Sequence, residues 1–122
     1  MRDGCIRVNG AGEKLDFTYV DDVADGIVAA TLSTATSNKT YNITKGHSES
    51  LIKAAELAIK IVGKGTIEVR DRDLDFPSRG ALNIDAATQD FNFNPKVNIN
   101  EGFQIYYEWL NNSIYWSQKT VS

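Results

Sequence analysis

Arginine side chains in one charged, proline-containing loop are the best candidates in this sequence for holding an anionic ligand. Arg79 is the leading candidate, and Arg70 and Arg72 are weaker versions of the same idea. A guanidinium suits this role because its fixed fork of N–H donors matches the oxygens of a phosphate group. The alternative is that Arg79 is a solvated loop residue that pairs with Asp73 or Asp75.

Two Tyr-x-x-x-Lys strings have the residue types needed for proton exchange with a substrate hydroxyl, but their predicted positions do not suit that chemistry. Tyr41 and Lys45 fall on a predicted strand and its exit, where a four-residue spacing does not bring side chains together. Tyr115 and Lys119 fall at the end of the last predicted helix. His47 has no Ser, Cys or second His at a recognisable spacing. We therefore predict no catalytic residue.

Two further patterns could indicate a cofactor or a metal, and both have simpler explanations. Gly10 and Gly12 resemble the start of a dinucleotide loop, but Leu15 stands where the third glycine should be and no helix follows directly. A single cysteine, Cys5, and the single His47 leave no Cys/His metal cluster. We therefore expect a plain turn at the glycines, no metal site and no cofactor-binding residue in this chain.

The elements that must position the arginines follow from a short buried strand that stops at a helix. Residues 17–20 supply the β-prone part, Asp22 is the predicted N-cap, and the helix covers residues 23–32. Further strands are predicted at residues 6–8, 39–43 and 66–69, and further helices at residues 51–62, 86–90 and 98–116, with caps at Ser48 or Ser50, at Asp85, and at Asn98 with Glu101. The predicted fold class is α/β, a small domain of short strands and about four helices.

Composition limits what the chain does. A length of 122 residues allows one domain, residues 1–122, and a hydrophobic share of 42% is enough for a core. A net charge of −3 argues against nucleic acid or an anionic membrane as a partner. There is no signal peptide and no apolar run near the length of a membrane span, so we expect a soluble, cytoplasmic protein.

A series of short matches runs through the chain in a fixed order. It comprises Gly10 and Gly12, residues 16–24 (Asp-Phe-Thr-Tyr-Val-Asp-Asp-Val-Ala), Tyr41-Asn42-Ile43 with Gly46, then Arg79, Asp85, Pro95 and Glu101-Gly102. In this order the matches resemble the C-terminal portion of extended short-chain dehydrogenase/reductases, the NAD-dependent nucleotide-sugar epimerases and dehydratases. No single match is specific, whereas the ordered series is fairly specific.

The resemblance implies a function for this chain and assigns catalysis to a different region of the family's enzymes. In the family the NAD site and the catalytic Tyr-x-x-x-Lys lie upstream of the region that matches, so we expect a substrate-binding-type domain that is catalytically inactive alone. Arg79 resembles an arginine that reaches the diphosphate of a nucleotide sugar. The family's second phosphate arginine should precede Asp16, where this chain has Leu15, and Lys14 is the candidate substitute. NAD belongs to the parent family and not to this chain.

Two alternatives remain open at this point. The chain could instead be a structural or interaction module that forms a homodimer through the surface left by the missing Rossmann half, since a parallel sheet is normally covered on both faces. It could also be cut from a complete enzyme. The sequence does not name the sugar, the nucleotide or the biological partner.

Overall fold

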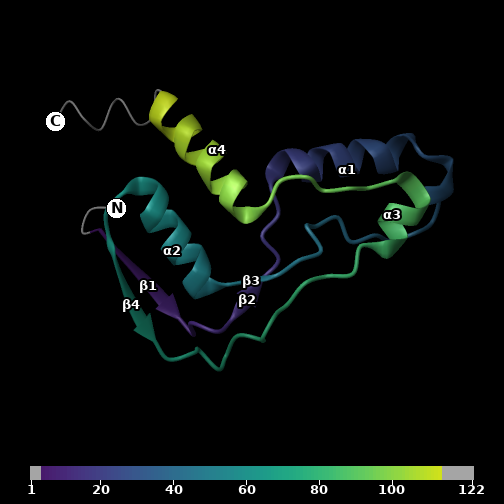
Figure 1. Ribbon diagram of the computed structural model, residues 1–122. Coiled ribbons are helices and arrows are strands. Elements are labelled where there is room, and N and C mark those ends of the chain that lie inside the picture. Colours follow the sequence, from purple (N-terminus) through teal and green to yellow (C-terminus); the bar gives the residue numbers. More distant parts are fainter. Residues whose placement is uncertain (1–3, 114–122) are drawn as a thin grey trace.

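The computed structural model describes residues 4–113, which form an α/β fold with four α-helices and short strands (Figure 1). The elements in chain order are β1 (Cys5–Asn9), β2 (Lys14–Leu15), α1 (Val20–Leu32), the 3-10 turn η1 (Thr34–Thr36), β3 (Glu49–Ser50), α2 (Leu51–Val62), β4 (Thr66–Arg70), α3 (Asp85–Phe91) and α4 (Ile99–Asn112). The predicted fold class is confirmed.

The strands form two separate pairs. β1 and β4 are parallel, with Cys5 opposite Thr66 and Asn9 opposite Arg70, and α2 packs against both strands. β2 and β3 are antiparallel, with Leu15 opposite Glu49. Because β3 leads directly into α2, the second pair places β2 beside the beginning of that helix.

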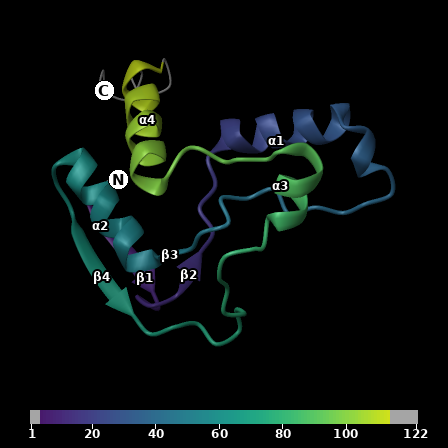
Figure 2. The same cartoon turned by 45° about the vertical axis from the view of Figure 1, so that its right-hand side comes forward.

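The apolar core lies in two places, between α1 and α3 and beneath α2, and Figure 2 shows these two groups of elements at opposite sides of the molecule. At one end of the molecule α1 and α3 enclose a cluster built on Ala87, Phe91 and Phe93. At the other end Val8 and two alanines of α2 are buried where the helix covers the β1–β4 pair. Residues 10–19, which include β2, connect β1 at one end to α1 at the other. Their position therefore depends on the packing at both ends.

Local capping signals explain the helices that the sequence predicted well. Ser50 accepts a hydrogen bond from the backbone N–H of Lys53, and Gly63 ends α2 in the left-handed conformation with φ of +81°, so the predicted range 51–62 is confirmed. Asn98 and Glu101 form the predicted capping box at the start of α4.

Several predicted boundaries are wrong, because tertiary contacts decide them. Residues 17–19 form no strand, and α1 begins at Val20 with Tyr19 as its N-cap, so Asp22 lies inside the helix. Asp22 is only 6% exposed and accepts hydrogen bonds from the backbone N–H groups of Lys96 and Val97. A carboxylate with these two distant partners is no longer available to cap its own helix.

Three further elements differ from the prediction. Residues 39–43 form no strand, because a strand needs a neighbour to share its backbone hydrogen bonds and the described chain supplies none there. Asp85 is the first residue of α3 and not its cap, which is Ile84. α4 ends at Asn112, with Ser113 already extended, and the remainder of the predicted helix lies outside the described residues.

Among the described helices, none combines the length and the apolar character needed to cross a bilayer.

Candidate functional site

A cavity of about 290 Å³ lies between β2 and the loop that follows β4. The structure brings three of the four predicted ligand-binding residues to this cavity, namely Lys14, Arg72 and Arg79. Its walls are completed by apolar side chains, among them Leu15, Leu51 and Phe76. Glu13 and Asp73 also line the cavity, so it combines three cations, two carboxylates and apolar walls.

Arg72 is held in place by the protein itself. Its Nε lies 2.9 Å from Oε1 of Glu13, and its Nη2 donates to the backbone carbonyl of Phe76 at 2.9 Å. The charge of Arg72 is therefore balanced within the cavity wall, and this side chain shapes the loop more than it offers charge to a ligand.

Arg79 and Lys14 carry the charge that is not balanced. Both side chains are exposed at the cavity, and within residues 4–113 neither forms an ion pair. In particular, the described structure shows no ion pair between Arg79 and Asp73 or Asp75. Asp73 lines the same cavity, forms no ion pair within the described part of the chain and offsets one of these charges, so the charged side chains of the lining sum to +1 in a chain whose overall charge is −3.

A second, larger cavity of about 660 Å³ shares two wall residues with the first. Arg79 and Leu15 line both cavities, and Thr18, Thr44 and Ser78 add hydroxyl groups to the second. Arg79 therefore stands where the two cavities meet, next to groups that can hydrogen-bond a polar ligand.

Arg70, the fourth candidate, does not reach this site. Its Nη2 lies 2.8 Å from Oε1 of Glu68, and Arg7 of the paired strand reaches the other oxygen of that carboxylate. Hydrogen bonding from Arg70 lowers the pKa of Glu68 below its ordinary value, although partial desolvation opposes this shift. Arg70 belongs to a charged network on the β1–β4 pair.

Two carboxylates that the sequence reasoning missed hold the loop of Arg79. Asp16 and Glu13, at the two ends of β2, accept hydrogen bonds from Leu82 and Ser78 respectively. Asp16 had been recognised only as part of a family motif, and its partners lie too far along the chain for any spacing rule to reveal them.

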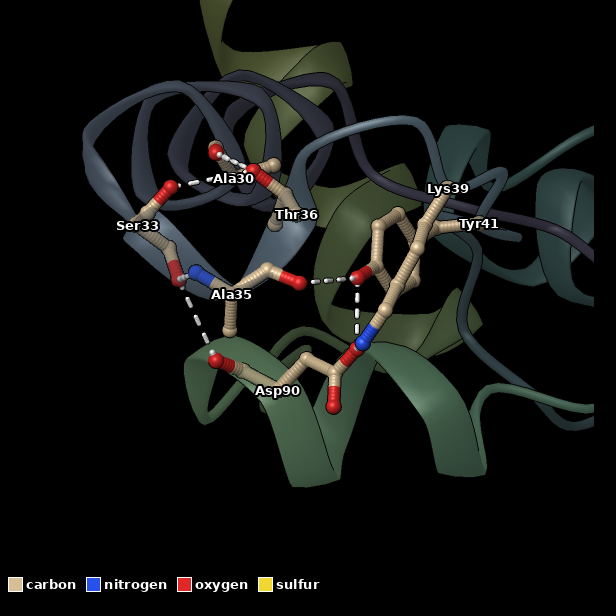
Figure 3. A network of polar contacts seen from close by, with 7 residues as sticks. All are labelled: Ala30, Ser33, Ala35, Thr36, Lys39, Tyr41 and Asp90. Atoms are coloured by element: carbon tan, nitrogen blue, oxygen red, sulfur yellow. Dashed lines mark hydrogen bonds and ion pairs between the residues drawn. The ribbon is translucent and has the colours of Figure 1, made fainter.

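Tyr41 and Lys45 point to different partners, and Figure 3 shows the contacts of Tyr41. The Tyr41 phenol donates to Oδ2 of Asp90 at 2.5 Å, whereas Nζ of Lys45 donates to the backbone carbonyl of Pro95 at 2.9 Å. Lys39 also reaches Asp90, at 2.9 Å. The structure thus gives this tyrosine a role in holding the segment 39–41 against α3. The second string, Tyr115 and Lys119, lies outside the described residues.

The glycine pattern is a turn between two strands, as predicted. Gly10 has φ of +77° and joins β1 to β2, so no helix follows it directly in the chain. The first backbone N–H groups of α2, those of Leu51 and Ile52, donate to the carbonyls of Glu13 and Ala11 in this turn, so they are already paired within the protein.

No protein-family model matches the chain. The structure is nevertheless similar to several solved enzymes. An epimerase from Methanothermobacter thermautotrophicus superposes with a TM-score of 0.84 over 93% of this chain and 35% of that enzyme, at 21% identity. A UDP-glucuronic acid 4-epimerase from Bacillus cereus, solved with UDP-glucuronic acid and NAD, gives 0.76 over 86% and 34%, at 24% identity. A dTDP-glucose 4,6-dehydratase from Bacillus anthracis, solved with NAD, gives 0.73 over 90% and 35%, at 22% identity.

The described chain therefore has the fold found in one part of the NAD-dependent nucleotide-sugar epimerases and dehydratases, the extended short-chain dehydrogenase/reductases. It spans about a third of the length of these structures, which is consistent with the C-terminal portion that the sequence motifs indicated. The resemblance predicted from the sequence is confirmed for the fold.

Proposed function

We propose that this chain binds a nucleotide sugar through its diphosphate, at the cavity that Lys14, Arg72 and Arg79 share. The observation that carries the proposal is the meeting of three cationic side chains, predicted separately from the sequence, at one opening. The likeness to an epimerase solved with UDP-glucuronic acid supports a nucleotide sugar as the ligand class.

The charge distribution suits a diphosphate. Glu13 balances Arg72, which leaves Lys14 and Arg79 to face the ligand against the single carboxylate of Asp73. A guanidinium binds phosphate oxygens through two parallel hydrogen bonds, and an ammonium adds a point charge. The hydroxyl oxygens of Thr44 and Ser78 in the second cavity donate to Asp16 and Glu13 but can still accept hydrogen bonds from the part of the ligand beyond the phosphates.

Binding and catalysis are separate in this proposal. The described residues offer no dinucleotide turn, and their Tyr-x-x-x-Lys string is engaged elsewhere. We therefore assign no proton or hydride transfer to residues 4–113, and we propose that turnover requires a NAD-binding domain in addition.

Calorimetric titration with UDP, dTDP and GDP sugars tests the proposal. We expect measurable binding of at least one of them, and an Arg79→Ala variant should bind it at least about tenfold more weakly, since bonds to charged groups contribute about 1.5–3 kcal/mol. Arg70→Ala is the matched control, because it removes an arginine outside the cavity and should leave affinity unchanged. Absence of binding by any of the nucleotide sugars, or equal losses in the two variants, would refute the proposal.

A second candidate function rests on a different surface. α1 exposes Val20, Ile27, Val28 and Leu32 at a spacing that places them on one side of the helix, and Leu32 is 80% exposed. We propose that this face mediates protein association, with a homodimer as the first case to test. Light scattering at tens of micromolar should then report twice the monomer mass, and Ile27→Asp should restore the monomer. A monomeric wild-type protein would contradict the homodimer.

A further inference from the structure

We propose that Glu13 and Asp16 are positioning residues, which fix the loop on either side of Arg79 and so aim its guanidinium at the cavity. This inference rests on the proposed ligand-binding role of Arg79. It goes beyond that role because it assigns a task to two carboxylates that do not themselves attract an anionic ligand.

Asp16 ties three segments together through one carboxylate. Its Oδ2 accepts hydrogen bonds from Oγ1 of Thr44 at 2.9 Å, from the backbone N–H of Gly46 at 3.1 Å and from the backbone N–H of Leu82 at 3.1 Å. Leu82 lies three positions after Arg79, so Asp16 fixes the exit of the loop to β2 and to the segment around residue 45.

Glu13 performs the same task at the other side of Arg79. Its Oε2 accepts from Oγ of Ser78 at 3.1 Å, immediately before Arg79, and its Oε1 lies 2.9 Å from Nε of Arg72. Glu13 and Asp16 flank the two residues of β2, Lys14 and Leu15, both of which line the cavity. Residues 13–16 therefore contribute one cation, Lys14, to the site and two carboxylates that hold the loop of the other cation, Arg79.

Such anchors are needed because residues 71–84 contain no helix or strand. A loop without backbone ladders samples many conformations, and a ligand that must order it binds more weakly. Hydrogen bonds to a charged acceptor are stronger than those to a neutral one, so two carboxylates can order this loop with few contacts. Their own charges are met by these donors, which limits their repulsion of a phosphate.

Site-resolved limited proteolysis tests the inference without any ligand. Trypsin cleaves after Arg79 and after Lys60 in α2, and the ratio of the two rates reports local opening of the loop against general unfolding. Asp16→Asn keeps one carbonyl oxygen but removes the negative charge that strengthens the three hydrogen bonds converging on Oδ2. We expect the Arg79 to Lys60 ratio to rise about tenfold in this variant, and less in Glu13→Gln, because there one hydrogen bond beside Arg79, that from Ser78, loses its charged acceptor.

Asp22→Asn is the matched control. Asp22 also accepts backbone hydrogen bonds from a distant segment, but that segment is residues 96–97 and not the Arg79 loop. This variant should lower overall stability and leave the ratio unchanged. Ser78→Ala, which removes one anchor without altering β2, should raise the ratio even if Asp16→Asn fails to fold. A wild-type ratio in Ser78→Ala and in any folded Asp16→Asn would overturn the inference.

Titration with the sugar nucleotide that the wild type binds completes the test. Asp16→Asn should weaken binding about tenfold, whereas Asp22→Asn should not. If the wild type binds no nucleotide sugar but the cleavage ratio changes as expected, the proposed function fails and the positioning of the loop stands. If binding is intact and the ratio is insensitive to all three loop variants, the positioning role fails alone.

Discussion

The phenol of Tyr41 lies 2.5 Å from Oδ2 of Asp90, and this bond joins two segments that are 49 residues apart (Figure 3). Burial, helped by the hydrogen bond and the negative charge of Asp90, raises the pKa of Tyr41 to about 12. The same hydrogen bond, together with that from Lys39, lowers the pKa of Asp90 below its ordinary value of 3.8. The ionised carboxylate and the neutral phenol therefore stabilise each other in the folded protein.

This pair predicts a contribution to acid sensitivity. The pKa of Asp90 is lower in the folded than in the unfolded state, so its stabilisation is complete above the unfolded value and is lost as pH falls through the folded one. Urea unfolding between pH 7 and pH 2 should show a larger loss of stability in the wild type than in Asp90→Asn. Parallel curves for the two proteins would show that the carboxylate does not contribute.

Gly26→Ala should destabilise the protein even though alanine favours a helix. A Cβ at this position of α1 would lie 2.6 Å from Cγ2 of Ile43 and 2.8 Å from Cε2 of Phe93. Helix propensity would gain about 1 kcal/mol, whereas overpacking costs about 1–3 kcal/mol. We expect a net loss of about 1 kcal/mol in chemical denaturation, with Gly80→Ala, in an open loop position, as the control. If Gly26→Ala were more stable than the wild type, α1 would have to move away from Ile43 and Phe93 at little cost in free energy.

Asp22→Ala should be among the more damaging single substitutions. The buried carboxylate accepts from Lys96 N at 3.0 Å and from Val97 N at 2.9 Å, and its removal leaves both N–H groups without that partner. Unsatisfied buried donors cost about 1–3 kcal/mol each, and Lys96 is exposed and Val97 only half-buried, so water can reach these donors and the expected loss is about 2 kcal/mol. Asp25→Ala, on an exposed part of the same helix, should change stability little. Thermal unfolding of both variants would decide whether Asp22 is this important.

Arg79→Lys separates charge from geometry at the proposed site. The substitution keeps the positive charge but loses the fork of donors that matches phosphate oxygens. We expect affinity for a nucleotide sugar between those of the wild type and Arg79→Ala, with a stronger dependence on salt than the wild type shows. Calorimetry at two ionic strengths measures both quantities. If Arg79→Lys bound as tightly as the wild type, bidentate binding would not be required.

Elements with local signals could be predicted from the sequence, and elements that depend on distant partners could not. α2 was predicted to the residue because Ser50 and Gly63 cap it through their own neighbours. Asp22 looked like a cap because its true partners are 74 and 75 residues away. Residues 39–43 have the composition of a strand, but composition does not supply the neighbouring strand on which the hydrogen bonds depend.

The candidate site divides in the same way. Lys14, Arg72 and Arg79 were predicted because their side chains are cationic; the family resemblance applied to Arg79, with Lys14 as a substitute for a missing arginine. Arg70, the weaker candidate, does not line this cavity, and its pairing with Glu68 depends on the conformation of β4, which the sequence did not reveal. The anchoring role of Glu13 and Asp16 could not be predicted, because their partners are a hydroxyl and a backbone N–H 65 and 66 residues along the chain.

The parallel pairing of β1 with β4 has a consequence for how the protein is made. Positions 7 and 68, which face each other across the two strands, are separated by 61 residues, so a ribosome that adds 5–20 residues per second needs about 3–12 s between them. During that interval β1 has been translated, but β4, the strand with which it pairs, has not. Nascent chains stalled before residue 66 should therefore recruit chaperones that the completed polypeptide releases.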